Sequence, residues 1–171
     1  MSLVRMDIQT IAVGGGAIPS LIVLKSRESE ERASIQLPIR IGTVEATAIS
    51  MGLDRLSHDR PMTHDLMVSV IDSLGATLTS VSIVDVNGTT FFAELNLLTE
   101  SGVRRTIDCR PSDAIALAVR KGVPILAEEQ VLDAATLPDF KSVERAEQEQ
   151  DLARFHDFVE SLSPSDFLEL E

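Results

Sequence analysis

The sequence predicts an α+β fold that contains a β-β-β-α unit twice, with mainly antiparallel sheets packed around buried helices. In each half of the chain, three strand-like segments separated by turn residues precede a helix-like segment. The segment from Ile39 also aligns without a gap with the segment from Ile107, so that Glu45 falls on Asp113. After Pro138, apolar residues at helical spacing in a polar background predict an amphipathic C-terminal helix.

The first half of the chain is predicted to contain three strands and two helices. Apolar and polar residues alternate in the strands, and the glycines at 14–16 supply a turn between the first two. Thr63 is the predicted N-cap of the second helix, and Gly75 ends that helix. The predicted apolar face of this helix comprises Leu66, Met67, Val70, Ile71 and Leu74. The expected bounds are 3–13, 18–26 and 33–41 for the strands, then 43–51 and 63–74 for the helices.

The second half is predicted to repeat the order of three strands and a helix. Asn-Gly and Ser-Gly pairs supply the turns between the strands. Pro111 suits the first position of a helix, and Gly122 lies just past its end. The expected bounds are 77–86, 89–99 and 103–110 for the strands and 111–121 for the helix, followed by a short strand and a capping segment within 123–132.

The negative charge of the chain is unevenly distributed. The net charge is −12, and most of the acidic excess follows residue 138. We therefore expect a folded domain over 1–138 and an acidic helical extension over 139–171, in which the apolar positions are Leu152, Phe155, Val159 and Leu162. Such a field repels nucleic acid unless metal ions or clustered arginines offset it.

Composition excludes several classes of protein. No apolar run is long enough to span a membrane, and the N-terminus lacks the pattern of a signal peptide, so the sequence predicts a cytoplasmic protein. The single cysteine, Cys109, rules out an internal disulfide and is interpreted as a small core residue rather than a nucleophile. Aromatic residues make up 4% of the chain, so stacking platforms for single-stranded nucleic acid are nearly absent.

Acidic residues at the starts of predicted helices have a structural interpretation. Glu45 and Asp113 occupy the first turns of their helices, where a carboxylate can serve free backbone N–H groups and meet the positive end of the helix dipole. Arg110 would pair with Asp113. Asp65 likewise favours the first turn of its helix, and His64 borders the apolar face.

The same residues have a catalytic interpretation. Carboxylates that converge could bind hydrated Mg²⁺ or Mn²⁺, which would activate water and stabilise the leaving oxygen in phosphodiester cleavage. Arginines would then hold the phosphate oxygens. The candidate catalytic residues are Glu45, His64, Asp65, Asp108 and Asp113, of which Glu45, Asp108 and Asp113 would hold the metal; the candidate phosphate-binding residues are Arg60, Arg110 and Arg120.

Several strings of the sequence resemble the bifunctional nuclease family, whose members are described as having both DNase and RNase activity. They are LPIRIGTVEATAI, RPMTHDLM, LGATLTSVSIVD, FFAELNL and IDCRPSDAIALAVRKGVPI, and the resemblance extends from Leu3 to Ala135. It implies a compact α+β domain that forms a homo-oligomer and acts on DNA or RNA. The polar positions that match the family are Glu45, Arg60, His64, Asp65, Asp108, Arg110, Asp113 and Arg120.

Two functions follow from these interpretations. The first is a metal-assisted nuclease that hydrolyses DNA and RNA with little sequence preference. The second is a non-enzymatic oligomeric binding or regulatory module, in which the same polar residues are helix caps and buried ion pairs. An enzyme that acts on a different small phosphorylated substrate is a further alternative.

Overall fold

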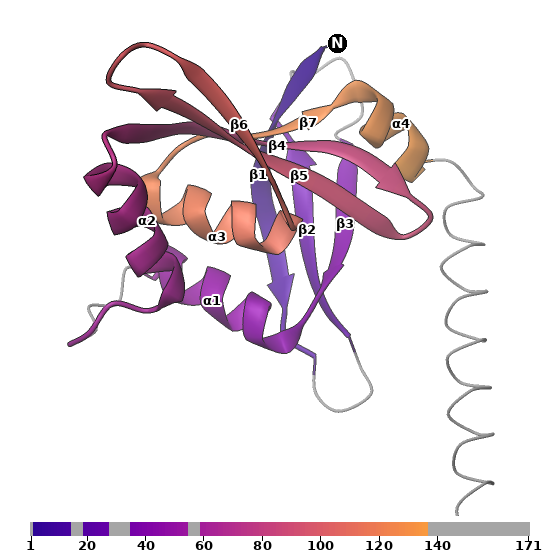
Figure 1. Ribbon diagram of the computed structural model, residues 1–171. Helices are drawn as coiled ribbons and strands as arrows, with labels where there is room; N and C mark the ends of the chain where they lie inside the picture. Colours follow the sequence, from indigo (N-terminus) through magenta and orange to yellow (C-terminus); the bar gives the residue numbers. More distant parts are fainter. Residues whose placement is uncertain (1, 15–18, 28–34, 55–58, 137–171) are drawn as a thin grey trace, which may run out of the picture. The chain divides into compact units, whose positions relative to one another are not determined.

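The computed structural model describes residues 2–14, 19–27, 35–54 and 59–136, and the fold class within these ranges is α+β, as predicted. Figure 1 shows a twisted sheet with three helices clustered beside it. In chain order the elements are β1 (Leu3–Ala12), β2 (Ser20–Ser26), β3 (Gln36–Ile41), α1 (Thr43–Leu53), α2 (Thr63–Ser73), β4 (Ala76–Asn87), β5 (Thr90–Thr99), β6 (Arg104–Cys109), α3 (Pro111–Lys121), β7 (Ile125–Glu128) and α4 (Glu129–Thr136).

The strands form one mixed sheet of seven strands in the order β3-β2-β1-β7-β4-β5-β6. All neighbouring strands pair antiparallel except β4 and β7, which are parallel. The pairing is mainly antiparallel, as predicted, but the strands form one sheet rather than several, because the short strand β7 lies between β1 and β4 and joins the two halves. Three strands and a helix do occur in each half in the predicted order, while a duplication of that unit stays a prediction.

Helix α3 forms the centre of the core. Its apolar residues from Ala114 to Ala118 are all buried, which confirms the predicted burial for this helix. Three alanines in this stretch let α1, β4 and β5 approach closely. Pro111 occupies the first turn and Gly122, at φ 68°, ends the helix, as the sequence predicts.

Gly52 permits the close contact between α1 and α3. A Cβ atom at this position would lie 2.7 Å from both Val119 Cγ2 and Arg120 Nη1. The substitution Gly52→Ala must therefore separate the helices or displace Arg120, and we expect the free energy of unfolding to fall by about 1–3 kcal/mol. Urea denaturation followed by far-UV circular dichroism measures the loss. An unchanged unfolding midpoint would contradict the close packing.

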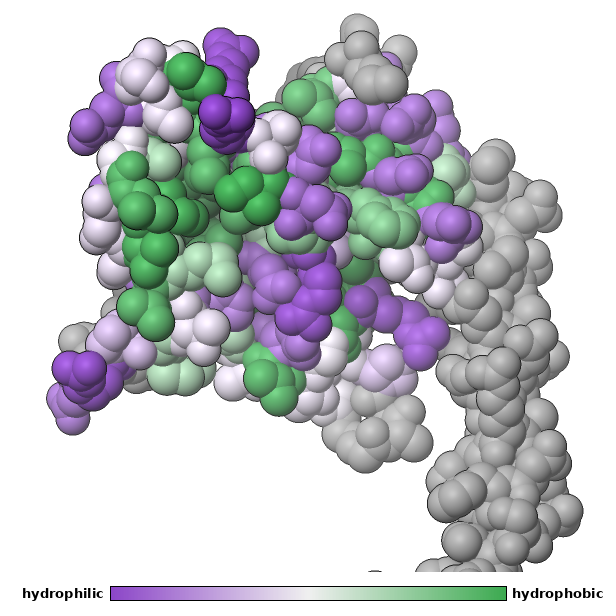
Figure 2. All heavy atoms as spheres, viewed as in Figure 1, coloured by the Kyte–Doolittle hydropathy of each residue, from purple (hydrophilic) through white to green (hydrophobic). Residues whose placement is uncertain are grey.

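Helix α2 turns polar residues toward α3 and much of its apolar side toward solvent. Lys121 Nζ of α3 donates to Asp72 Oδ1 over 2.9 Å. Of the predicted apolar face, Leu66 is 54%, Val70 46% and Leu74 79% exposed. Figure 2 shows the corresponding cluster of hydrophobic side chains over α2. The predicted face, which comprises Leu66, Met67, Val70, Ile71 and Leu74, therefore contributes little to the core.

The N-terminus of α2 differs from the prediction by one residue. The N-cap is Met62 rather than Thr63, because the Met62 backbone N–H donates to Asp65 Oδ2 over 2.9 Å and Thr63 is already helical. The predicted end is confirmed, since Gly75 has a φ of 68°. The predicted C-terminal helix in 139–171 lies outside the described residues. No helix within the described ranges is long and apolar enough to cross a membrane.

Candidate functional site

A cavity of about 460 Å³ lies between α1, α2 and the start of α3. Its apolar wall is formed largely by Met51, Met62 and Met67, and its polar end carries the side chains of Glu45, His64, Arg110 and Asp113. A second pocket of about 270 Å³ shares Glu45 and Arg110 with the first. An apolar cavity with a few convergent polar groups has the general character of a ligand site.

Asp113 is the centre of the polar end. Arg110 binds its carboxylate with two hydrogen bonds, from Nε to Oδ2 over 2.8 Å and from Nη2 to Oδ1 over 3.1 Å. His64 Nε2 lies 3.2 Å from Asp113 Oδ1. The first turn of α3 thus brings together a carboxylate, a guanidinium and an imidazole. The imidazole comes from α2, so the site depends on the packing of α2 against α3.

The ionisation of Asp113 fixes the roles of its partners. Burial alone would raise the pKa of Asp113, but hydrogen bonds from Arg110 and His64 outweigh it and hold the pKa below its ordinary value. At neutral pH the carboxylate is therefore ionised and only accepts hydrogen bonds. His64 must consequently donate from Nε2. In a neutral imidazole this leaves Nδ1 as the acceptor, and Nδ1 forms no hydrogen bond with any described residue.

Arg110 also joins Asp113 to Glu45. Its Nη1 donates to Glu45 Oε1 over 3.0 Å, while its side chain stays 65% exposed. Neither carboxylate accepts a backbone N–H in the part of the chain that the structure describes, so the predicted capping hydrogen bonds are absent there. Pairing of Arg110 with Asp113, which the structural interpretation also predicted, is present. The guanidinium lies between the two carboxylates, where the catalytic interpretation placed a cation.

Asp108 lies apart from this cluster. It belongs to β6, is exposed, and pairs across the strands with Glu94. The described residues contain no group of three or more His, Cys, Asp or Glu side chains arranged to hold a metal ion. The predicted metal ligands Glu45, Asp108 and Asp113 therefore do not form a preassembled Mg²⁺ or Mn²⁺ site, which would need several converging oxygens.

Arg120 and Asp65 form a second ion pair at the cavity wall. Arg120 Nε donates to Asp65 Oδ1 over 2.6 Å, and Nη1 donates to the backbone carbonyls of Ala48 and Ala116 over 3.0 and 2.9 Å. The Arg120 side chain is 9% exposed. It therefore ties α1, α2 and α3 together. Because these hydrogen bonds and the burial of the side chain occupy most of the guanidinium, few of its N–H groups are accessible to a phosphate. Arg60 is exposed and does not line the cavity.

Cys109 is not activated as a nucleophile. Burial raises the pKa of its thiol to about 11, and the nearby carboxylates of Asp113, Asp108 and Glu94 act in the same direction. Because the chain has a single cysteine, alkylation by iodoacetamide reports on this thiol alone. We expect slow alkylation at pH 7 and a rate that keeps rising past pH 9 in the folded protein. A rate that levels off near pH 8 would contradict the raised pKa.

Sequence reasoning missed two features of the site. The methionine wall was not foreseen, although Met51, Met62 and Met67 all lie close in sequence to the predicted site residues. The bridging role of Arg110 was also missed, because Glu45 and Arg110 are 65 residues apart in the chain. The alignment of Glu45 with Asp113 was the available signal, since it places both acids at equivalent helix starts that one arginine can reach.

Comparisons with known proteins identify the family. A family model described as the bifunctional nuclease domain matches residues 22–139. The chain is 42% identical over 135 residues to Uncharacterized protein MT1877 of Mycobacterium tuberculosis strain CDC 1551 / Oshkosh, an alignment that covers 77% of this chain and 80% of the relative. The same values hold for Uncharacterized protein Rv1829 of strain ATCC 25618 / H37Rv. The chain therefore belongs to the bifunctional nuclease domain family.

Proposed function

We propose that the protein hydrolyses phosphodiester bonds of DNA and RNA with little sequence preference, and that the cavity between α1, α2 and α3 is its active site. The observation that carries this proposal is the contact of His64 Nε2 with Asp113 Oδ1, 3.2 Å apart, at the polar end of that cavity. A carboxylate that orients an imidazole leaves the second ring nitrogen available as a general base. Membership of a nuclease family makes a phosphodiester the substrate that this base would serve.

In the proposed reaction, His64 Nδ1 takes a proton from a water molecule. The water oxygen forms a bond to phosphorus, the bond from phosphorus to the leaving oxygen breaks, and that oxygen takes a proton from solvent. Asp113 stabilises the imidazolium that forms, as an ionised carboxylate beside it should. Attack by water rather than by a ribose hydroxyl explains how one site would accept both DNA and RNA.

Arg110 is the proposed phosphate-binding residue. Its three nitrogens each donate one hydrogen bond to Glu45 or Asp113, and the two terminal nitrogens retain a further N–H each. The exposed guanidinium can direct these N–H groups at phosphate oxygens. The two carboxylates also keep the guanidinium in place before substrate binds, which lowers the entropic cost of positioning it.

Assistance by Mg²⁺ or Mn²⁺ stays a prediction. A cation bound between Glu45 and Asp113 would have to displace Arg110, because the guanidinium already neutralises both carboxylates. Cation binding and phosphate binding by Arg110 are therefore alternatives at this position. Activity that persists in chelator would favour the histidine mechanism alone.

A non-enzymatic binding or regulatory module is the second candidate function. The observation that favours it is the pairing of the predicted site residues: Arg110 neutralises Glu45 and Asp113, and Arg120 neutralises Asp65. Ion pairs of this kind also stabilise and orient packed helices without any catalysis. In that case the cavity would bind a ligand without hydrolysing it.

The test is hydrolysis of single-stranded DNA, double-stranded DNA and RNA, each with Mg²⁺, Mn²⁺ or chelator. Wild type, Asp113→Asn and the matched control Asp72→Asn are purified identically, because contaminating nucleases are potent. Asp72 carries an α2–α3 ion pair outside the cavity, so its replacement changes charge without touching the site. We expect activity in wild type and in Asp72→Asn, and loss in a folded Asp113→Asn. Equal cleavage by all three proteins would overturn the proposal.

A further inference from the structure

The small pocket of about 270 Å³ beside the cavity lies at the starts of α1 and α3. The N-cap residues of both helices, Gly42 and Arg110, line it. In neither helix does the N-cap residue cap a backbone N–H with its side chain. The first N–H groups of a helix have no partner within the helix and carry the positive end of its dipole, so the pocket adjoins two positive helix ends. The side chains of the pocket indicate what this setting is for.

Ser112 has an unused hydroxyl at this pocket. It belongs to the first turn of α3, lines the pocket, and is only 6% exposed. The described residues contain three other buried serines, and each of them forms a side-chain hydrogen bond: Ser20, Ser26 and Ser82. The Ser112 hydroxyl forms none with any described residue. Because a buried hydroxyl without a partner is costly and rare, the position favours a bound oxygen atom as its partner.

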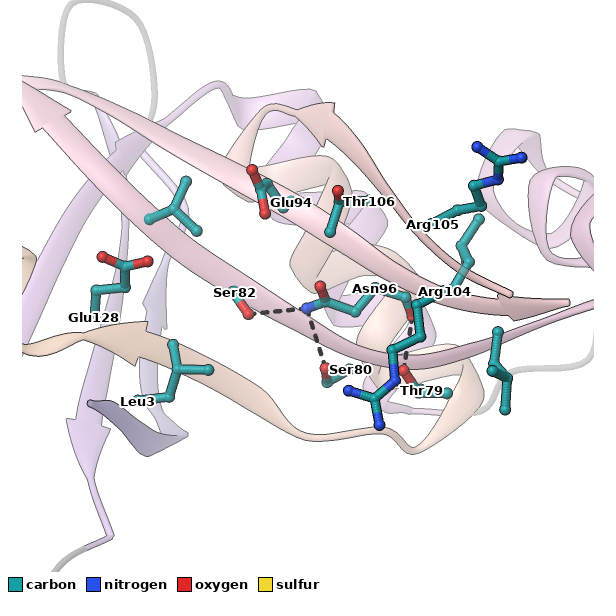
Figure 3. A pocket seen from close by; sticks show the side chains of 13 residues that line it. Leu3, Thr79, Ser80, Ser82, Glu94, Asn96, Arg104, Arg105, Thr106 and Glu128 are labelled. Carbon is teal, nitrogen blue, oxygen red and sulfur yellow. Dashed lines mark hydrogen bonds between the residues drawn. The ribbon is translucent and has the colours of Figure 1, made fainter. Parts of the chain in front are cut away.

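A larger pocket, of about 520 Å³, provides a comparison. It lies over β4, β5 and β6, and Figure 3 shows its polar side chains. Ser82 is 4% exposed there, but it accepts a hydrogen bond from Asn96 Nδ2 over 2.9 Å, and Ser80 accepts another over 3.1 Å. These polar side chains satisfy one another, whereas Ser112 keeps a donor for a ligand.

Arg40 brings an unpaired positive charge to the small pocket. It belongs to β3, lines the pocket and is half-buried. Within the part of the chain that the structure describes, it forms no ion pair. Glu45, the carboxylate among the lining residues, is instead paired with Arg110 over 3.0 Å. In a chain of net charge −12, an arginine that is kept apart from carboxylates favours a bound anion.

We propose that this pocket binds a phosphate group through the guanidinium of Arg40, the hydroxyl of Ser112 and the positive ends of α1 and α3. Guanidinium and hydroxyl groups are common donors to phosphate oxygens, and helix N-termini favour the same anion. The pocket is smaller than the roughly 300–1,000 Å³ of sites that enclose a drug-sized ligand. It therefore suits a single phosphate group rather than a whole nucleotide.

Arg110 places the pocket next to the proposed active site, because it lines both cavities. If the proposed function holds, on which this step rests, a strand whose scissile phosphodiester lies at His64 has a neighbouring phosphate at Arg40 and Ser112. Arg40 is then a positioning residue that binds substrate and transition state alike, so its loss raises KM more than it lowers kcat. The terminal phosphate of a nucleotide is the other source of the same chemical group.

Inorganic phosphate tests the pocket without any reaction. Added at constant ionic strength to ¹⁵N-labelled protein, it should shift the amide resonances of Gly42 and Ser112 saturably. Arg40→Gln and Ser112→Ala should each weaken binding by about tenfold or more, as expected for a lost hydrogen bond to a charged group. Arg5→Gln is the matched control, because Arg5 is exposed and lines neither cavity. No saturable shift, or an equal loss in all three variants, would overturn the proposal.

Thermal stability separates a binding role of Ser112 from a structural one. Ser112→Ala removes a hydroxyl that has no partner among the described residues. In buffer without phosphate, its melting temperature should therefore equal or exceed that of wild type. A fall of several degrees would show that the hydroxyl stabilises the fold, which would overturn its assignment to a ligand.

Two dinucleotides identify the source of the phosphate. Thymidylyl-thymidine carries a backbone phosphate alone, and its 5′-phosphorylated form adds a terminal one. Both are added to His64→Gln, which prevents turnover, in competition with inorganic phosphate. Displacement by both supports a strand phosphate, displacement by the phosphorylated form alone supports a terminal phosphate, and displacement by neither would overturn the proposal.

These measurements are independent of the proposed reaction. Phosphate binding at Arg40 and Ser112 in a wild-type protein that cleaves no nucleic acid would overturn the reaction and leave this site in place. Cleavage by a wild-type protein that binds no phosphate at Arg40 and Ser112 would overturn this site and leave the reaction in place.

Discussion

Substitution of His64 by glutamine is expected to lower the rate of DNA and RNA hydrolysis by about 10²–10⁴-fold, the usual contribution of a positioned general base. Glutamine can still donate a hydrogen bond to Asp113, so the packing of α2 on α3 is retained. It cannot take a proton from water. Steady-state kinetics on a fluorogenic oligonucleotide should therefore show a lower kcat with little change in KM.

The same measurement separates catalysis from loss of structure. The melting temperature of His64→Gln should stay within a few degrees of wild type, because the substituted side chain keeps its hydrogen-bonding partner. Asp72→Asn, purified in parallel, should keep full activity. If His64→Gln cleaved substrate as fast as this control, His64 would not be the base, and the cleavage would have to be assigned to another site or to a contaminant.

Substitution of Arg120 by methionine is expected to lower the free energy of unfolding by about 3 kcal/mol, the lower end of the cost of breaking a buried ion pair. The lower end applies because Asp65 is about one-third exposed and keeps its hydrogen bond from the Met62 backbone. Methionine fills much of the volume of the arginine side chain. The decrease in the free energy of unfolding therefore measures the contribution of the guanidinium and its hydrogen bonds. Urea unfolding at fixed protein concentration measures it.

A series of substitutions at Arg120 identifies which of its contacts contributes most to the free energy of unfolding. Arg120→Lys retains a charge beside Asp65 but cannot reach Asp65 and the Ala48 carbonyl together, so it should lose an intermediate amount. Arg120→Met combined with Asp65→Leu should recover part of the stability, because no unpaired carboxylate is left. Full stability of Arg120→Met alone would show that Arg120 does not tie the three helices together.

The sequence was most informative where local chemistry decides the structure. Strand alternation, turn glycines and Pro111 predict the order of elements, which the structure confirms. The equivalent positions of Glu45 and Asp113 were also visible, because a short alignment without gaps is enough to relate two helix starts. These features depend on neighbours in the chain. They need no knowledge of which elements meet in space.

The remaining features depend on contacts between distant segments. Asp108 precedes the helix start by only a few residues, but strand alternation turns it to the face away from Cys109 and toward Glu94. The apolar pattern of α2 predicted a buried face, whereas the side chains of α2 that pair with α3 at the cavity are the polar residues His64 and Asp65. The single sheet depends on β7, whose pairing with both β1 and β4 no local pattern indicates.

The most direct test of the central claim is whether a nucleic acid phosphate reaches His64. The imidazole resonances of the three histidines can be followed by NMR while a phosphorothioate oligonucleotide, which resists hydrolysis, is added. The His64 signal is identified by its absence in His64→Gln. We predict a saturable shift of the His64 resonance that Arg110→Gln weakens. An oligonucleotide that leaves the His64 resonance in place, whether or not other resonances move, would contradict an active site at this cavity.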